Sequence, residues 1–386
     1  MTRLTIPAVL ARGGASRGLL LHAEDLERFP PQQRDRLLAR LVGSPDPTYR
    51  QADGAGGGNV TTSKVASVGR PSRADCDVDY TYHQVDVASG EVDRRGTCGN
   101  LVTAVGQFAV DSDLVRAIEP LTRVRVHDVN TGHVVWVEVP VESGRVRYHG
   151  DVTMGGVPGT GAGVVTTFLR PAGAVTGTLY PSGSGLDRVA TDAGTVRVTL
   201  IDVVNPVVLV HHDSLGRWPG WQREDIMGDG RLLTQLEEVR RWSAVRCGLA
   251  ESQETAGVEA KALPFVGVLC DSRMGAFPDL GLPQSVTAAV RMLSGGLVHG
   301  ALPLSAAMAT AVAVGLRGPQ ADCPERDKRV VLGHASGTLT IDVGYGSPEP
   351  DQATGVERVS VVQTGRPIMS GHMHIPADLD PTSAAD

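Results

Sequence analysis

The sequence predicts an α+β protein of two similar halves, each a sheet wrapped around one buried central helix. Strand-like runs recur along the chain, and helical segments are fewer. Two of the helical segments, 98–110 and 303–316, are almost uncharged around their whole circumference, and one lies in each half. A helix that is apolar on all sides belongs in the middle of a domain. The length of 386 residues also exceeds one ordinary core, which favours two domains.

The other elements follow from the hydrophobic pattern. Alternation and β-branched residues predict strands, and longer segments with apolar residues at helical spacing predict helices. The strands are 123–129, 133–141, 195–212, 265–270, 329–345 and 356–364; the helices are 30–43, 98–115, 229–248, 284–296 and 303–316. The Gly/Ser-rich segment 177–188 predicts the linker. We therefore expect domains at 1–182 and 183–370, with 371–386 packing back on the first.

Composition and charge exclude several classes of partner. The 43 acidic and 36 basic residues give a net charge of −7, and without a basic run nucleic acid is not expected. No apolar run reaches the roughly 18 residues of a membrane span, and no signal peptide is apparent at the N-terminus. The five cysteines form no CxxC pair, which predicts free thiols in the cytoplasm.

Cofactors are not expected either. The close histidine pairs, His211–His212 and His372–His374, lack standard zinc spacing. A dinucleotide fingerprint is also missing from the sequence. The sequence therefore predicts neither a metal nor a flavin.

The richest polar segment is QADGAGGGNVTTSKVASV, residues 51–68. Its three consecutive glycines, Gly56–Gly58, can form a concave row of N–H groups that holds an anion. Asn59, Ser63 and Lys64 follow, but Lys64 comes after the serine, so the segment is not a P-loop. A polar hairpin loop with an exposed lysine is the alternative.

A second glycine turn, ARGGASRGLLLH, follows the first strand. Gly14, Ser16 and Arg17 offer a backbone donor, a hydroxyl and a guanidinium that suit a carboxylate. Such turns are common after a first strand, so the pattern alone carries little weight.

Cys98 begins the uncharged segment CGNLVTAVGQFAV. A helix start carries partial positive charge and unpaired N–H groups. A thiol there is activated, and the amides of Gly99 and Asn100 can bind a substrate carboxylate. The alternative is a buried structural cysteine, as we expect for Cys247 and Cys270.

These motifs resemble PrpF-like proteins. IPAVLARGGASRGLLL, QADGAGGGNVTTSKVASV, CGNLVTAVGQFAV, VNPVVLV and VVQTGRPIMSGHMHIP fall in the family's order, over about residues 4 to 377. The family contains methylaconitate and aconitate isomerases, methylitaconate isomerase and 4-oxalomesaconate tautomerase. It shares the diaminopimelate epimerase fold, so the resemblance implies a mostly antiparallel sheet around each central helix.

The resemblance also implies site residues. The family's catalytic lysine matches Lys64, and its catalytic cysteine matches Cys98. The family's carboxylate-binding turn and cleft match Gly14, Ser16, Arg17, Asn59 and Ser63. The helix start adds Gly99 and Asn100, and the second half of the chain adds His299. The expected substrate-binding residues are therefore Gly14, Ser16, Arg17, Asn59, Ser63, Gly99, Asn100 and His299.

Two departures affect the substrate pocket. This chain has Gly14-Ala15-Ser16-Arg17-Gly18 where the family usually reads Gly-Thr-Ser-Lys-Gly, and His299-Gly300 where it often has His-Lys. The family's lysine in the first motif is thus replaced by Arg17, and its lysine in the second motif is lost at Gly300. No cysteine begins 303–316, which disfavours the two-cysteine epimerase mechanism.

The predicted function is a cofactor-independent isomerase or tautomerase that shifts a C=C bond in an unsaturated di- or tricarboxylate. Lys64 is the expected base, with Cys98 as partner acid or anion-stabilising donor, and the opposite assignment stays open. The alternatives are a non-catalytic accessory protein to an aconitase-type enzyme and a Cys98-dependent hydrolase. A homodimer is an assembly that the sequence leaves open.

Overall fold

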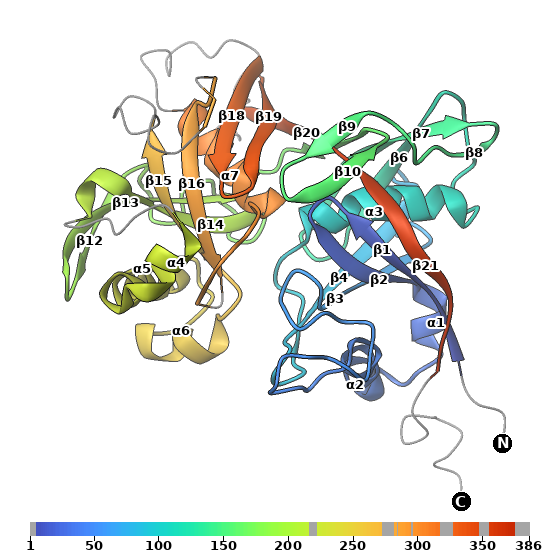
Figure 1. The fold of residues 1–386 in the computed structure, drawn as a ribbon, viewed down its shortest axis with the longest axis horizontal. Helices are drawn as coiled ribbons and strands as arrows, with labels where there is room; N and C mark the ends of the chain where they lie inside the picture. The colour runs from blue at the N-terminus through green and yellow to red at the C-terminus, as the bar shows by residue number, and fades with distance from the viewer. Residues whose placement is uncertain are drawn as a thin grey trace, which may run out of the picture. The chain divides into compact units, whose positions relative to one another are not determined.

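The computed structural model describes residues 5–215, 222–271, 282–283, 285–294, 296–316, 327–346 and 355–374. They form two compact units, each with its own set of paired strands and one buried helix (Figure 1). By its described residues, unit 1 comprises 5–153, 158–167 and 362–374, and unit 2 comprises 154–157 and 168–361 with the gaps given above. The chain thus crosses between the units near residues 153–168, before the predicted boundary at 182/183, and crosses again at residues 361–362.

Unit 1 is a twisted sheet with helices on both faces. Strand pairing gives the order β21–β1–β2–β3–β4–β6–β7, in which β2 with β3 and β4 with β6 are parallel and the other neighbours antiparallel. The strands are β1 (Thr5–Gly13), β2 (Ser16–His22), β3 (Lys64–Gly69), β4 (Val78–Val85), β5 (Val92–Asp93), β6 (Leu121–Asp128), β7 (His133–Glu142), β8 (Arg145–Val146) and β21 (Gly365–His374).

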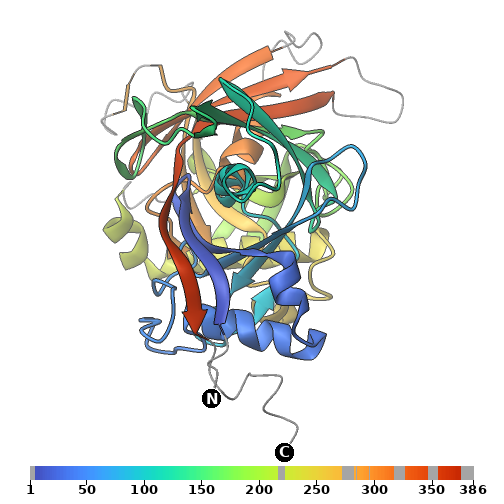
Figure 2. The ribbon, with the colours of Figure 1, turned by 90° about the vertical axis from the view of Figure 1, so that its right-hand side faces the viewer.

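Helix α3 (Gly99–Asp111) packs against the strands of unit 1 and is buried along its length up to Val110. Figure 2 looks along this helix, with strands on several sides of it. The short helix α1 (Ala23–Glu27) and helix α2 (Pro31–Val42) pack on the sheet through a separate apolar cluster. The prediction of a buried helix at 98–110 is confirmed.

Unit 2 repeats this order of pairing. Its strands run β12–β13–β14–β15–β16–β18–β19–β20, again with two parallel pairs, β14 with β15 and β16 with β18. They are β12 (Asp187–Thr191), β13 (Gly194–Val203), β14 (Asn205–His211), β15 (Phe265–Asp271), β16 (Ala288–Ser294), β17 (Leu297–Val298), β18 (Asp327–His334), β19 (Gly337–Tyr345) and β20 (Val356–Gln363). The strands β9 (Val152–Met154), β10 (Val157–Gly161) and β11 (Val164–Leu169) lie where the chain first crosses between the units.

The central helix of unit 2 is α7 (Leu304–Gly315), buried from Leu304 to Val314. Helix α5 (Gly230–Arg246) packs on β12, β14 and β15, with α4 (Arg223–Gly228) and α6 (Gln253–Glu259) beside it. Each unit is therefore a sheet with one fully buried helix, and the α+β prediction of two similar domains is confirmed.

One predicted helix is wrong. Residues 284–296 contain strand β16, which pairs with β15 and β18. The described side chains from Ala288 to Leu293 are all buried, so the strand shows no alternation of apolar and polar residues. A strand buried on both faces cannot be told from a buried helix by periodicity alone.

Candidate functional site

Lys64 lies at the start of β3, directly after the glycine-rich loop. Its strand partner is Gln84 of β4, and Ala66 is paired with Tyr82. Because residues paired across two strands share a face, Lys64, Tyr82 and Gln84 all point to one side of the sheet. Gly18 allows the close approach of β2, since a Cβ there would lie 2.9 Å from the Lys64 carbonyl oxygen and 3.0 Å from Leu101 Cδ2 of α3.

Cys98 is the N-cap residue of α3, with an extended backbone at φ −112° and ψ 93°. Its carbonyl oxygen accepts from the N–H groups of Leu101 and Val102, which begins the helix. The side chain is 6% exposed. The thiol therefore lies at the positive end of a buried helix.

The two predicted catalytic residues meet. Lys64 Nζ donates to Cys98 Sγ at 3.2 Å. The Cys98 thiol also lies 3.9 Å from the buried Ser16 Oγ. An amine and a thiol at this separation can pass a proton between them, and the alternative of an exposed loop lysine is excluded.

Two opposing effects act on the pKa of Lys64. Burial lowers it, but attraction to Cys98 and Tyr82, with hydrogen bonds to both, outweighs burial and raises the pKa above its ordinary value. Lys64 Nζ also lies over the Tyr82 ring, 5.3 Å from its centroid. This environment favours the ammonium form of the lysine.

Gly14 brings the first turn against the start of α3. Its φ is +52°, and a Cβ there would lie 2.3 Å from Asn100 Oδ1. The Gly14 N–H donates to the Thr364 carbonyl at 3.0 Å. Arg12 ties the same two segments together, donating to the carbonyls of Gly14 and Thr364. Only glycine fits this junction, because both the backbone conformation and the space exclude a side chain.

Asn100, in the first turn of α3, is held from the far end of the chain. Its Oδ1 accepts from Gln363 Nε2 at 2.7 Å, and Gln363 Oε1 accepts from Thr103 Oγ1 at 2.8 Å. All three side chains are buried. This fixes the Asn100 side chain, while Gly99 beside it offers no side chain that could obstruct the helix start.

Three other predicted residues belong to the glycine-rich loop or contact it. The Arg17 N–H donates to the Thr61 carbonyl at 3.0 Å, and a Cβ on Gly57 would lie 2.7 Å from Arg17 Nη2. Asn59 Oδ1 accepts from the backbone and hydroxyl of Thr61. Ser63 is fully buried, and its Oγ accepts from Gln51 Nε2 at 2.7 Å. The Asn59 and Ser63 side chains thus make contacts that hold the loop.

His299 belongs to unit 2. Its N–H donates to the Met292 carbonyl at 2.9 Å, and its ring meets Phe265 edge-on at 6.1 Å. Further along, Asn205 Nδ2 donates at 2.9 Å to Ser305 Oγ in the first turn of α7. The participation of His299 in the site, and a shared cleft for the two helix starts, stay predictions.

Three residues around the pair were not predicted from the sequence: Tyr82, Gln84 and Gln363. Alternating residues in VDYTYHQV, 78–85, could have indicated strand β4 and placed Tyr82 and Gln84 on one face. Gln363 has no comparable local signal, because it meets Asn100 from 263 residues away.

A cysteine hydrolase would need a histidine beside Cys98. The Cys98 side-chain partners in the described part of unit 1 are Lys64 and Ser16, and no histidine is among them. His83 of unit 1 instead contacts Ser67 and Arg94. Over the described ranges, no group of three or more His, Cys, Asp or Glu residues is placed to hold a metal ion.

Comparison with known proteins identifies the family. A model described as "PrpF protein" matches residues 3–376. The chain belongs to the PrpF family. The 3-methylitaconate isomerase of Eubacterium barkeri is 33% identical to it, over 97% of this chain and 98% of the relative. The 2-methyl-aconitate isomerase of Cupriavidus necator is 32% identical over 97% and 98%, and the 4-oxalomesaconate tautomerase of Pseudomonas putida 34% over 89% and 90%.

Solved structures agree. The crystal structure of a methylitaconate-delta-isomerase matches with a TM-score of 0.75 and 31% identity, over 98% of this chain and 97% of the other. A hydroxyproline epimerase from Agrobacterium vitis, at 15% identity and a TM-score of 0.55 over 98% and 93%, shares the fold. This PrpF protein is an isomerase. Among the residues that the structure describes, no helix is long and apolar enough to cross a membrane.

Proposed function

We propose that this PrpF protein shifts a C=C bond within an unsaturated di- or tricarboxylate of the aconitate, methylaconitate, methylitaconate or oxalomesaconate type. The observation that carries the proposal is the 3.2 Å contact between Lys64 Nζ and Cys98 Sγ at the start of α3. The substrates named for the relatives support the choice of substrate class. Moving a double bond requires a proton to leave one carbon and another to reach a second carbon.

Both proton steps can be assigned to the pair. The raised pKa of Lys64 favours its ammonium form, so we assign Lys64 as the acid that supplies a proton to one carbon. The Cys98 sulfur is then the base that takes the substrate proton, which is the opposite of the assignment expected from the sequence. A thiol and a neutral amine remain. Transfer of the proton from Sγ to Nζ then restores the pair, so the cycle needs no net proton and no redox or metal cofactor.

The intermediate is an allylic or dienolate anion whose charge collects on a carboxylate. The N–H groups at the start of α3, from Gly99 and Asn100, suit that charge. Gly14, Ser16 and Arg17 lie at the same end of the helix or beside the glycine-rich loop. Ser16 supplies a hydroxyl and Arg17 a cation, while Gly14, whose N–H is bonded to the Thr364 carbonyl, allows the close approach of this turn to Asn100. We assign the substrate carboxylates to these groups and to His299.

Cellular context is part of the proposal. The described cysteines Cys76, Cys98, Cys247 and Cys270 form no disulfide, which supports a cytoplasmic enzyme. A homodimer stays a prediction.

Incubation with cis- or trans-aconitate, 2-methylaconitate or 3-methylitaconate in D₂O tests the function. We expect an isomer and deuterium at the carbon that receives the proton. A hydrolase would instead consume ester or amide substrates. An accessory protein would leave all four acids unchanged and stimulate an added aconitase, and that result would overturn the proposal.

A further inference from the structure

Tyr82 contacts the Lys64 side chain that the proposed reaction uses. Its ring is 5% exposed and faces Lys64 Nζ at 5.3 Å from the centroid. The tyrosine hydroxyl donates to Gln84 Oε1, and Gln84 Nε2 donates to the Ser63 carbonyl at 3.0 Å. Gln84 thus fixes the ring and also holds the backbone just before Lys64.

One asparagine anchors Tyr82 to the segment that leads to Cys98. The parallel pairing of β4 with β6 ends at Tyr80 and Asp128, so the strand gives Tyr82 no partner there. Asn130 replaces it: its Oδ1 accepts from the Tyr82 N–H at 2.8 Å, and its Nδ2 donates to the Tyr82 carbonyl at 2.9 Å. The same Nδ2 donates to the carbonyl of Arg94, shortly before Cys98, at 2.8 Å.

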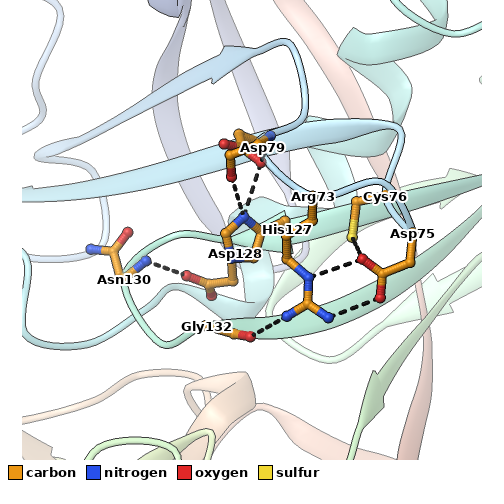
Figure 3. Close-up of polar contacts among 9 residues, drawn as sticks. Arg73, Asp75, Cys76, Asp79, His127, Asp128, Asn130 and Gly132 are labelled. Atoms are coloured by element: carbon orange, nitrogen blue, oxygen red, sulfur yellow. Dashed lines mark hydrogen bonds and ion pairs between the residues drawn. The ribbon is translucent and has the colours of Figure 1, made fainter.

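Asn130 is itself fixed. Its N–H donates to Asp128 Oδ1 at 3.1 Å, a contact drawn in Figure 3. Asp128 is fully buried at the end of β6. A single amide side chain therefore links the strand of Tyr82 with the segment that ends in Cys98.

We propose that Tyr82 is a positioning residue of the isomerase reaction, whose ring, anchored by Gln84 and Asn130, holds the Lys64 ammonium against the Cys98 sulfur. The role rests on the proposed function, because it concerns the same pair. The electron-rich face of an aromatic ring attracts an ammonium group, most strongly where water is excluded. Burial raises the pKa of the Tyr82 hydroxyl, so the ring remains a neutral phenol at ordinary pH.

Among the described residues, the other titratable groups near the pair include Tyr80 of β4, a buried tyrosine that interacts with Cys98 and Tyr82. Cys98 faces Lys64 from the start of α3, and Tyr82 faces it from β4. Asp93 of β5 also acts on Tyr82, but Arg95 holds that carboxylate in a two-point contact. The principal groups that set the charge on Lys64 are therefore Cys98 and Tyr82.

The test compares Tyr82→Leu, which removes the π face, with Tyr82→Phe, which keeps it. For Tyr82→Leu we expect kcat to fall about 10-fold with KM within about 2-fold, the size of a lost buried cation–π contact. Tyr82→Phe keeps the ring face but loses the hydroxyl that also acts on Lys64, so it should recover part of kcat. The matched control is Tyr345→Leu in unit 2, where a buried tyrosine faces Lys328 Nζ at 5.8 Å; kcat should not change.

A second readout needs no substrate. Alkylation of Cys98 by iodoacetamide, followed on its peptide by mass spectrometry, reports how the ammonium held against the sulfur affects its reactivity. In Tyr82→Leu the alkylation profile should show a changed rate at neutral pH, in Tyr345→Leu it should match the wild type, and Tyr82→Phe should lie between the two.

An unchanged alkylation profile and kcat in folded Tyr82→Leu would overturn the inference. If that variant does not fold, Tyr82→Met supplies the same comparison. Failure of the wild type to isomerise any tested acid would count against the proposed function alone, since the alkylation profile still decides the role of Tyr82.

Discussion

At the residue scale, the Lys64–Cys98 contact has a simple origin in the backbone. Lys64 is the first residue of a strand and Cys98 the last residue before a helix. Side chains at such ends can approach each other while the strand and helix stay fully hydrogen-bonded. In the proposed reaction the two groups pass one proton between them across this 3.2 Å contact.

Lys64→Ala and Cys98→Ala should each lower turnover about 10²–10⁴-fold, the usual cost of losing a positioned acid or base. The double variant should be little worse than the poorer single one, because groups that act as a unit are not additive. Cys98→Ser tests the proton transfer more directly than alanine does, because the serine hydroxyl is a far weaker acid than the cysteine thiol. Steady-state kinetics measures all four, and full activity in Lys64→Ala would refute the assignment.

His83 makes a second, independent prediction about pH. Burial lowers its pKa to about 3, and the nearby Arg94 guanidinium adds to the effect. Its Nδ1 accepts from Arg94 Nε at 2.8 Å, so a proton there would oppose a cation. The folded chain excludes a proton that the unfolded chain binds below about pH 6.5. The contribution of His83 to stability is thus complete above that pH and is lost as the pH falls toward 3.

The loss should approach about 1.4 kcal/mol per pH unit within this window. His83→Gln keeps one donor and one acceptor without titrating, so its stability should fall less between pH 7 and 5. Urea unfolding at both values measures the difference. His149→Gln, at a side chain that is 76% exposed, is the control and should follow the wild type; equal acid sensitivity in His83→Gln would contradict the argument.

At the scale of the element, α3 is buried all round, and its neighbours leave no spare volume. A Cβ on Gly106 would lie 2.4 Å from Val137 Cγ1 and 2.7 Å from Val137 Cβ on β7. The helix can approach the strand this closely only because the side chain is missing.

Gly106→Ala should therefore destabilise the protein by about 1–3 kcal/mol, the range for overpacking a core. Gly230→Ala is the matched helical control, because nothing lies within 4 Å of a Cβ there and alanine favours a helix. Thermal unfolding of both variants distinguishes crowding from helix propensity. If Gly106→Ala were as stable as Gly230→Ala, β7 would have moved to accommodate the added methyl group, and the prediction would be wrong.

The sequence pattern located both central helices, because a long segment without charged residues on any side predicts a buried helix from local sequence alone. It did not locate β16, whose buried faces remove the alternation. It also did not locate β4, where the alternation holds except at Tyr82 and His83, which are neighbours and both buried. The proposed catalytic pair, Lys64 and Cys98, followed from motif resemblance and from the chemistry of a helix start. Tyr82 and Gln363 could not be predicted in this way, because their roles arise from strand register and from contacts between distant segments.

At the scale of the whole molecule, unit 1 is built from both ends of the sequence. β21 pairs antiparallel with β1 over nearly its whole length. Arg12 donates to Thr364, 352 residues further on. Unit 2 has no such dependence, since apart from one turn it is a continuous stretch from Phe168 to Val361.

In refolding, hairpin β13–β14 of unit 2 should gain amide protection before the β1–β21 ladder of unit 1, because closing a very long loop costs more entropy. Pulse-labelled hydrogen exchange read by mass spectrometry follows both. Earlier protection of β21 than of β14 would contradict the expected order.

The late arrival of β21 also matters during translation. A nascent chain that has reached Val361 already carries Lys64, Cys98 and both central helices, yet it lacks Gln363, which holds Asn100, and the strand that covers β1. The ribosome thus delivers every reactive group long before the segment that orders the start of α3. Premature termination after Val361 would release a chain with all the proposed reactive groups and an incomplete first unit. Synthesis of β21, and not of Lys64 and Cys98, is then the step that completes unit 1.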